Sequence, residues 1–289
     1  MAAAGDPLPS RTLACLFSAQ SVQGTAVTPA TSPGLVDFSL GIENDLRSVF
    51  SIGAPNAKFL KPGINSCTWQ VNNRGVQTKA ILQRAVRSSG IVPWTTWGFG
   101  YDDDASTQFA YQIQDCKTGG IDVALDADGM LTAQLSGIGG LITELSSFTQ
   151  AHLSETPMMA YEAILTRGGS AYAVRNFRFT VNHNLQADPM IRGAAAGSFP
   201  RGWSYLTEGN EEITGEITRF AKSGVNLQAA TVAGSDIVLT CTDAAGGCAP
   251  TTIAITLAGT KFGSEVFAGE VGGIATFSQP FTALTWSIA

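Results

Sequence analysis

The sequence predicts a mainly β protein, an antiparallel β-sandwich or barrel with one flanking α-helix. Three observations favour this fold class. Hydrophobic residues make up 44% of the 289 residues and charged residues only 14%, 32 glycines supply turns, and apolar and polar residues alternate along several stretches. Strands do not alternate with long helical patterns, which excludes a parallel α/β sheet.

The N-terminal part differs in pattern from the rest of the chain. Residues 1–50 carry Pro and Gly without lasting periodicity, which predicts an extended N-terminal arm and a first strand region. Residues 51–289 are expected to form a single β-sandwich domain. Within it, Pro and Gly recur over 52–73, which favours a loop with one short strand at 67–71.

One helix is expected near residues 76–88. Apolar residues recur there at helical spacing beside basic ones, and Gly90 supplies a stop. This is the helix that should flank the sandwich.

A β-hairpin is expected directly before residue 136. Apolar residues alternate over 121–126 and again over 131–135, and Asp128-Gly129 between them is a favoured tight-turn pair. A calcium loop over the same residues would need a carboxylate where Leu135 stands. The hairpin, with one apolar and one acidic face, is therefore the favoured interpretation.

A second long strand covers residues 175–185, and its expected partner is 211–220. The segment between them is rich in Pro and Gly and predicts a long surface loop. Further strands are expected at 160–166, 236–240, 252–257, 273–277 and 282–288.

The sequence contains no recognisable catalytic or metal-binding motif. It has two histidines, of which His183 falls on the apolar side of a strand and His152 in a loop, and it lacks a Gly-x-Ser-x-Gly elbow. The five cysteines do not have metal-ligand spacing. We expect no enzymatic activity and no cofactor or metal.

The cysteines and the apolar runs indicate the cell compartment in which the chain folds. An odd, scattered set of cysteines suggests reduced, buried thiols in a chain that folds in cytosol. Cys241 and Cys248 bracket a Gly-Gly turn, so a bridge between them and two packed thiols both stay open. No apolar run is long enough for a membrane-spanning helix, and no secretory signal is expected.

Four aromatic residues lie close together at Trp94, Trp97, Phe99 and Tyr101. On an extended segment the last three share a face and Trp94 points the other way. Two interpretations stay open: packing against the sandwich or another subunit, and a platform on which sugars stack.

The chain resembles the major tail tube proteins of long-tailed, siphovirus-like bacteriophages. The likeness rests on the strand 174–185, on the loop with Pro200-Arg201-Gly202, on the turn and strand 208–218, and on the opening segment 24–29. It is a pattern of strands and turns that covers most of the chain in order, since this family has no invariant chemical motif. The loop from Cys241 to Cys248 matches no shared feature.

The resemblance implies a fold of the phage tail-tube type and a structural role in the virion. Subunits of that family join into rings, usually hexamers, which stack into the tube through which DNA is ejected. The implied partners are further copies of the chain and the tape-measure, tail-terminator and baseplate or distal tail proteins. The implied location is the virion tail, after folding in the bacterial host cytoplasm.

Charge fits that role. Lys and Arg number 17 against 23 Asp and Glu, a net charge of −6, which is the wrong sign for a protein that grips nucleic acid. Residues 102–128 alone carry seven acids against Lys117. Candidates to face the lumen, or else bulk solvent, are Asp122, Asp126, Glu212 and Glu216.

The aromatic group Trp94, Trp97, Phe99 and Tyr101 supplies the candidates for a subunit interface. The alternative functions are a carbohydrate-binding β-sandwich module, such as a tail-tip adhesin, and a capsid-decoration module.

Overall fold

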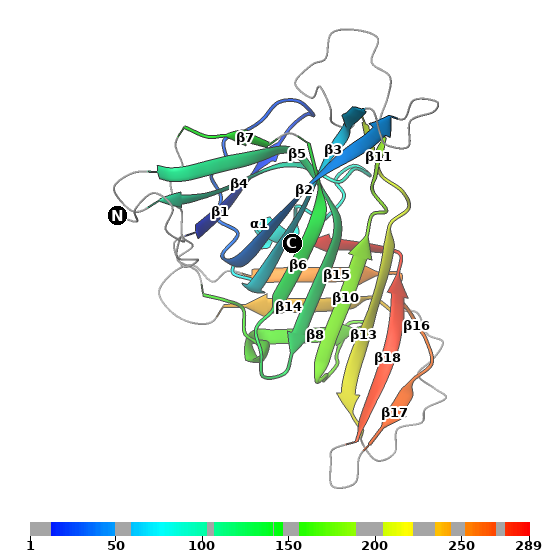
Figure 1. Cartoon of the computed structure of the whole chain (residues 1–289). Helices are drawn as coiled ribbons and strands as arrows, with labels where there is room; N and C mark the ends of the chain where they lie inside the picture. The colour runs from blue at the N-terminus through cyan, green and yellow to red at the C-terminus, as the bar shows by residue number, and fades with distance from the viewer. Residues whose placement is uncertain are drawn as a thin grey trace.

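The computed structural model describes residues 13–49, 59–102, 107–140, 142–146, 156–188, 205–221, 235–243, 252–269 and 275–289. They form a mainly β protein with large antiparallel sheets and almost no helix, so this much of the expected fold class is confirmed (Figure 1). No helix in these ranges is long and apolar enough to cross a membrane.

The main sheet has twelve strands, and every pairing in it is antiparallel. Its main path runs through β16 (Lys261–Phe262), β18 (Thr276–Ala283), β13 (Glu212–Phe220), β10 (Asn176–Asn182), β5 (Thr107–Asp126), β6 (Thr132–Gly139), β3 (Phe59–Gly75) and β2 (Leu35–Val49). Off this path lie β1 (Leu13–Gln20), β4 (Trp94–Asp102), β7 (Ile142–Glu144) and β17 (Val266–Ala268).

A second, five-stranded sheet covers one face of the first. Its order is β19 (Thr285–Ile288), β15 (Thr252–Ala258), β14 (Ile237–Thr242), β8 (Ala163–Arg167) and β9 (Ser170–Ala171). In Figure 1 its strands β8, β14 and β15 run across the far side of β6, β10 and β13. A short pair, β11 (Gln186–Asp188) with β12 (Tyr205–Thr207), and a 3-10 turn, η2 (Ala160–Glu162), complete the described elements.

The core lies between these two sheets because both present alternate apolar residues to the same space. Phe177 and Phe179 of β10 are fully buried, and the Phe179 ring meets Trp286 of β19 edge-on at 5.7 Å. Leu239 and Ile255 enter the same cluster from β14 and β15. The opposite face of β10 is therefore free to be polar.

The strand β5 bends at Asp115, and its two halves pair with different strands of the main sheet. Its first half pairs with β4 and β7, and its second half pairs with β6 and β10. Asp115 has a left-handed backbone (φ 56°), which Asp tolerates better than most residues. Its buried carboxylate accepts bonds from Gln20 Nε2 and from Gly24 N (2.7 Å), and burial raises its pKa.

The expected hairpin and the expected pair of long strands are both confirmed. The β5–β6 hairpin pairs Ile121 with Leu135 and closes with Gly129 N bonded to the Asp126 carbonyl at 3.0 Å. The β10–β13 pair is antiparallel, with Asn182 opposite Glu212. Each of the five further segments expected as strands overlaps an observed one.

The expected helix over 76–88 is wrong in extent. Helix α1 covers only Lys79–Leu82, capped by Thr78, and the chain then continues in tight turns in which Ala85 N bonds to the Leu82 carbonyl. Most of the apolar residues that suggested a long helix are buried in the core from these turns, and Ala80 and Val86 pack against it partly buried. Their spacing therefore reflects packing of a compact turn, since a short apolar pattern does not fix helix length.

The short strand expected at 67–71 is confirmed as part of β3, but the loop expected over the rest of 52–73 is wrong for residues 59–66, which also belong to this strand. Strand β3 runs from Phe59 to Gly75 through Pro62 and Gly63. Its second neighbour, β6, pairs only with Cys67–Asn73, so among the described strands one side of β3 has no partner at Pro62, and a residue without an N–H is tolerated there. Residues 51–58 lie outside the described part.

Gly215 tests the packing of the main sheet. A Cβ at this position would lie 2.5 Å from the Arg178 carbonyl oxygen and would overlap the Phe281 ring. We expect Gly215→Ala to lower the free energy of unfolding by about 1–3 kcal/mol because backbone and ring must shift. Urea denaturation would measure it.

The matched control is Gly129→Ala, whose Cβ would make only an ordinary 3.6 Å contact. Equal stability losses for the two variants would contradict this account of Gly215.

Candidate functional site

The face of the main sheet that points away from the five-stranded sheet is polar. On β10 and β13 buried apolar residues alternate with polar ones that face outward. We call this surface the polar face. Its members on the described strands include Asp37, Ser39, Gln70, Asn72, Asp122, Asp126, Gln134, Ser136, Arg178, Thr180, Asn182, Glu212, Thr214 and Glu216.

All four carboxylates proposed for the lumen lie on the polar face. Asp122 and Asp126 project from β5, Glu212 and Glu216 from β13, and strand β10 runs between them. Because the period of a strand is two, residues four apart on each strand share this face. Whether the face borders a lumen stays a prediction.

The polar face contains two adjoining hollows. One has a volume of about 740 Å³ over β3, β6, β5 and β10, and the other, about 540 Å³, lies over β3, β6, β5, β10 and β13. Asp122 and Gln134 contribute to the walls of both. Amides, hydroxyls and carboxylates make up about half of these walls, and apolar groups make up the rest.

Arg178 interrupts the acids at the centre of the polar face. Its Nε donates to both oxygens of Asp122 at 3.0 and 3.1 Å, and Nη2 donates to one of them at 2.5 Å. Glu216 stands opposite it on β13. The hydrogen bond to Asp122 and then the charges of Asp122 and Glu216 raise the pKa of Arg178.

A second arginine–aspartate pair lies beside the smaller hollow, which Arg74 and Arg178 both line. Arg74 Nε donates to Asp37 Oδ2 at 2.6 Å. Among the residues whose side chains are described, the strand positions of the polar face thus carry five acids, Asp37, Asp122, Asp126, Glu212 and Glu216, against Arg74, Arg178 and Lys261 of β16. The described face has a net charge of −2.

The sequence alone did not identify the arginine pairs as part of the site. Arg178 and Asp122 are 56 residues apart in the sequence. The register places Thr180 opposite Asp122, which makes Arg178 a diagonal neighbour of that carboxylate. Such a register cannot be read from local alternation.

The aromatic candidates do not behave as one group. Trp97 is fully buried, with the rings of Trp69 and Phe17 at 5.0 and 5.3 Å, so its own chain encloses it and it offers nothing to a neighbour. Phe99 is half-buried and stacks on Phe38 at 5.1 Å.

Trp94 lies under the Lys117 ammonium, with 4.3 Å from Nζ to the ring centroid. The backbone of Tyr101 pairs with Leu13, and its side chain lies outside the described part. An interface role for Trp94, Phe99 and Tyr101 stays a prediction.

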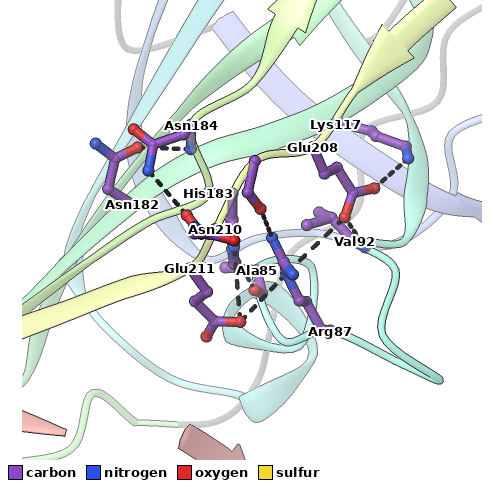
Figure 2. A network of polar contacts seen from close by, with 11 residues as sticks. Ala85, Arg87, Val92, Lys117, Asn182, His183, Asn184, Glu208, Asn210 and Glu211 are labelled. Atoms are coloured by element: carbon purple, nitrogen blue, oxygen red, sulfur yellow. Dashed lines mark hydrogen bonds and ion pairs between the residues drawn. The ribbon is translucent and has the colours of Figure 1, made fainter. Parts of the chain in front are cut away.

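A buried ionic cluster anchors the segment that leads into β13 (Figure 2). Lys117 of β5 pairs with Glu208, whose other oxygen accepts a bond from Val92 N at 3.0 Å. Arg87 lies between Glu208 and Glu211, at 3.9 and 3.2 Å, and also donates to the Gly209 carbonyl at 2.6 Å. Residues 208–211 are thereby fixed to the turns after α1.

His183 completes this cluster from the end of β10. It is fully buried, and its Nε2 lies 2.8 Å from the Ala85 carbonyl, which assigns the proton to Nε2. Its Nδ1 lies 4.0 Å from Glu211 (Figure 2). Burial lowers the pKa of His183, which fits the structural role expected for it, whereas His152 lies outside the described residues.

The described cysteines are buried free thiols at positions 15, 67, 116 and 241. Burial raises the pKa of Cys67 and of Cys241 to about 12, so neither is an activated nucleophile. Cys248, the proposed partner of Cys241, lies outside the described residues.

Comparison with known proteins does not assign the chain to a family. No family model matches it, and no curated protein matches its sequence. The likeness to tail tube proteins therefore rests on its own strands and turns.

The Lys117–Glu208 pair should matter for stability because both side chains are almost fully buried. We expect Lys117→Ala to lower the free energy of unfolding by about 3 kcal/mol, since it leaves a buried carboxylate without its closest cation. Chemical denaturation measures this loss. The double variant Lys117→Met with Glu208→Gln removes both charges and should recover part of it; no recovery would contradict the ion-pair explanation.

His183 should make stability depend on pH. Its pKa in the folded protein lies below the ordinary value of 6.5, so the unfolded chain binds a proton first as pH falls. Stability should therefore be complete above this value and decline as pH drops below it.

The matched variant is His183→Gln, which keeps a donor for the Ala85 carbonyl but does not titrate. Thermal unfolding of both proteins across this range isolates the effect of His183 from that of Glu211, whose raised pKa acts in the opposite direction. Parallel stability curves would refute the assignment.

Proposed function

We propose that this chain is a tail tube subunit: a structural protein whose copies join side by side into a ring, and whose rings stack into a hollow tube that passes DNA. The observation that carries the proposal is a continuous polar face bordered at both ends by strands with an open side. The resemblance described above supports the same function.

The two ends of the main sheet differ from each other. Strand β2 pairs with β3 alone, and β17 pairs with β18 alone among the described residues. Each leaves a row of backbone donors and acceptors available to another strand. A contact between two different edges is head-to-tail, and such contacts produce a ring when the rotation closes.

Strand β17 carries apolar side chains outward. Val266 and Phe267 are 59% and 58% exposed, and Phe220 is exposed at the end of β13, two strands away. Apolar residues on an open edge make a monomer prone to aggregate. In an assembly the same residues are buried in the contact between subunits.

The β2–β3 hairpin supports an axial contact. Strand β3 pairs with β6 only from Cys67 onward, so within the described part of the chain residues 59–66 pair with β2 alone and form a two-stranded ribbon beyond the sheet. An isolated ribbon of this kind is marginally stable in water. Its seven to eight residues extend about 25 Å, enough to reach a neighbouring ring.

The charge of the polar face supports an inward direction for it. A net −2 per copy on the described strands, repeated around a ring, would give a bore that repels phosphate. DNA would pass without strong adhesion, because adhesion comes from cations that replace the counterions of the phosphates.

The sugar-binding alternative has less support. A stacking platform needs exposed rings, and Trp97 is enclosed by the core. A capsid-decoration module remains a rival, and it predicts binding to a capsid lattice without polymerisation.

Val266→Lys tests the edge. A charged side chain on an exposed edge strand opposes strand addition, so the variant should fold but not assemble. We expect wild-type protein at rising concentration to form rings or tubes of uniform bore in electron micrographs, and Val266→Lys to stay monomeric.

Val22→Lys is the matched control, since Val22 is 56% exposed but lies in the bend after β1. It should assemble like the wild type. Wild-type monomers at every concentration, or tubes from Val266→Lys, would count against the proposal.

A further inference from the structure

Both arginines of the polar face line the smaller hollow. Arg178 reaches it from β10 and Arg74 from the end of β3, and their side chains are 66% and 74% exposed. Guanidinium groups in this setting match phosphate oxygens as well as carboxylate oxygens. The hollow thus holds the components of a phosphate site on a surface that is otherwise acidic.

Each of these guanidinium groups already has a carboxylate partner. Asp122 accepts three bonds from Arg178 and one from the Thr180 hydroxyl at 3.3 Å, which holds the carboxylate in place. Arg74 donates through Nε and Nη2 to one oxygen of Asp37, both at 2.6 Å. On each guanidinium the edge formed by Nε and Nη2, which could bind a phosphate through two parallel hydrogen bonds, is therefore occupied from within the chain.

We propose that the hollow between β3 and β10 is a self-masked phosphate site, in which Asp122 and Asp37 occupy the two arginines and so prevent DNA from binding there. Asp122 and Asp37 are positioning residues, because they act on DNA through Arg178 and Arg74. The biological meaning of the site rests on the proposed function, but its chemistry can be tested on the isolated subunit.

Masking does something that net charge does not. Repulsion between the acidic face and a phosphate is screened within about 8 Å at physiological ionic strength. A guanidinium in direct contact with a phosphate would still bind it locally and release counterions. In a ring such contacts would repeat in every copy, so even weak ones would retard a sliding duplex.

The test compares Asp122→Asn with Asp126→Asn. Both substitutions remove one negative charge from the polar face, but the first removes the carboxylate bonded to Arg178, whereas the ion pairs of the described residues do not include Asp126. The full-length subunit is titrated into a short fluorescent DNA duplex, and anisotropy is read at about 50 mM and about 200 mM salt.

We expect Asp122→Asn to bind DNA more tightly than Asp126→Asn. One added phosphate contact should also make its affinity fall about threefold more between the two salt concentrations. Adding Arg178→Gln to Asp122→Asn should abolish the gain, and adding Asp37→Asn should enlarge it. Unchanged circular dichroism and melting temperature verify that each variant is folded.

Equal binding by Asp122→Asn and Asp126→Asn, or no gain in either, would overturn the proposal. So would a gain that persists after Arg178→Gln, because the site would then lie elsewhere. The titration is done where size-exclusion chromatography shows a single species. A failure to form tubes would therefore count against the proposed function, but the DNA titration could still be interpreted.

Discussion

Alternation of apolar and polar side chains along β5, β10 and β13 is the constraint on which the rest of the structure depends. Phe177 and Phe179 must meet the five-stranded sheet, so Arg178 and Thr180 must point away from it. A slip of one residue would exchange the two faces and bury a guanidinium. Packing of the apolar residues against the five-stranded sheet thus fixes which residues point to the opposite face of the main sheet, and these residues make up the polar face.

Two buried polar groups add specificity to this framework. Asp115 and Gln20 hold the bend of β5 against β1, and the Lys117–Glu208–Arg87 cluster holds residues 208–211 against the turns after α1. Burying such charges is costly unless each is paired, so these contacts add little net stability but penalise any other arrangement. The Lys117–Glu208–Arg87 cluster holds the residues directly before β13. It therefore fixes where this strand begins and which side of the sheet Glu212 and Glu216 occupy.

Local patterns predicted the pieces of this fold that depend on neighbours in sequence. The alternation over 121–135 and the Asp128-Gly129 turn were enough for the β5–β6 hairpin, and parity placed all four candidate carboxylates on polar strand faces. Contacts made at a distance could not be predicted in this way. The length of β3 depends on its pairing with β2, and burial of Trp97 depends on β1 and β3 packing around it.

The open edge at β17 lacks the usual protection of an edge strand, which argues that it has a partner. Monomeric sheet proteins guard such edges with charged side chains, Pro or a covering segment, yet β17 reads Val-Phe-Ala. The same edge carries one lysine, Lys261 of β16, and the opposite edge strand β2 contains charged residues but no Lys or Pro. The polar face shows the opposite tendency, since its two arginines are held by carboxylates and are not left free to bind anions. The open edge favours contact with another copy of the chain, and the polar face disfavours binding of anions. This combination suits the wall of an assembly through which an anionic polymer passes.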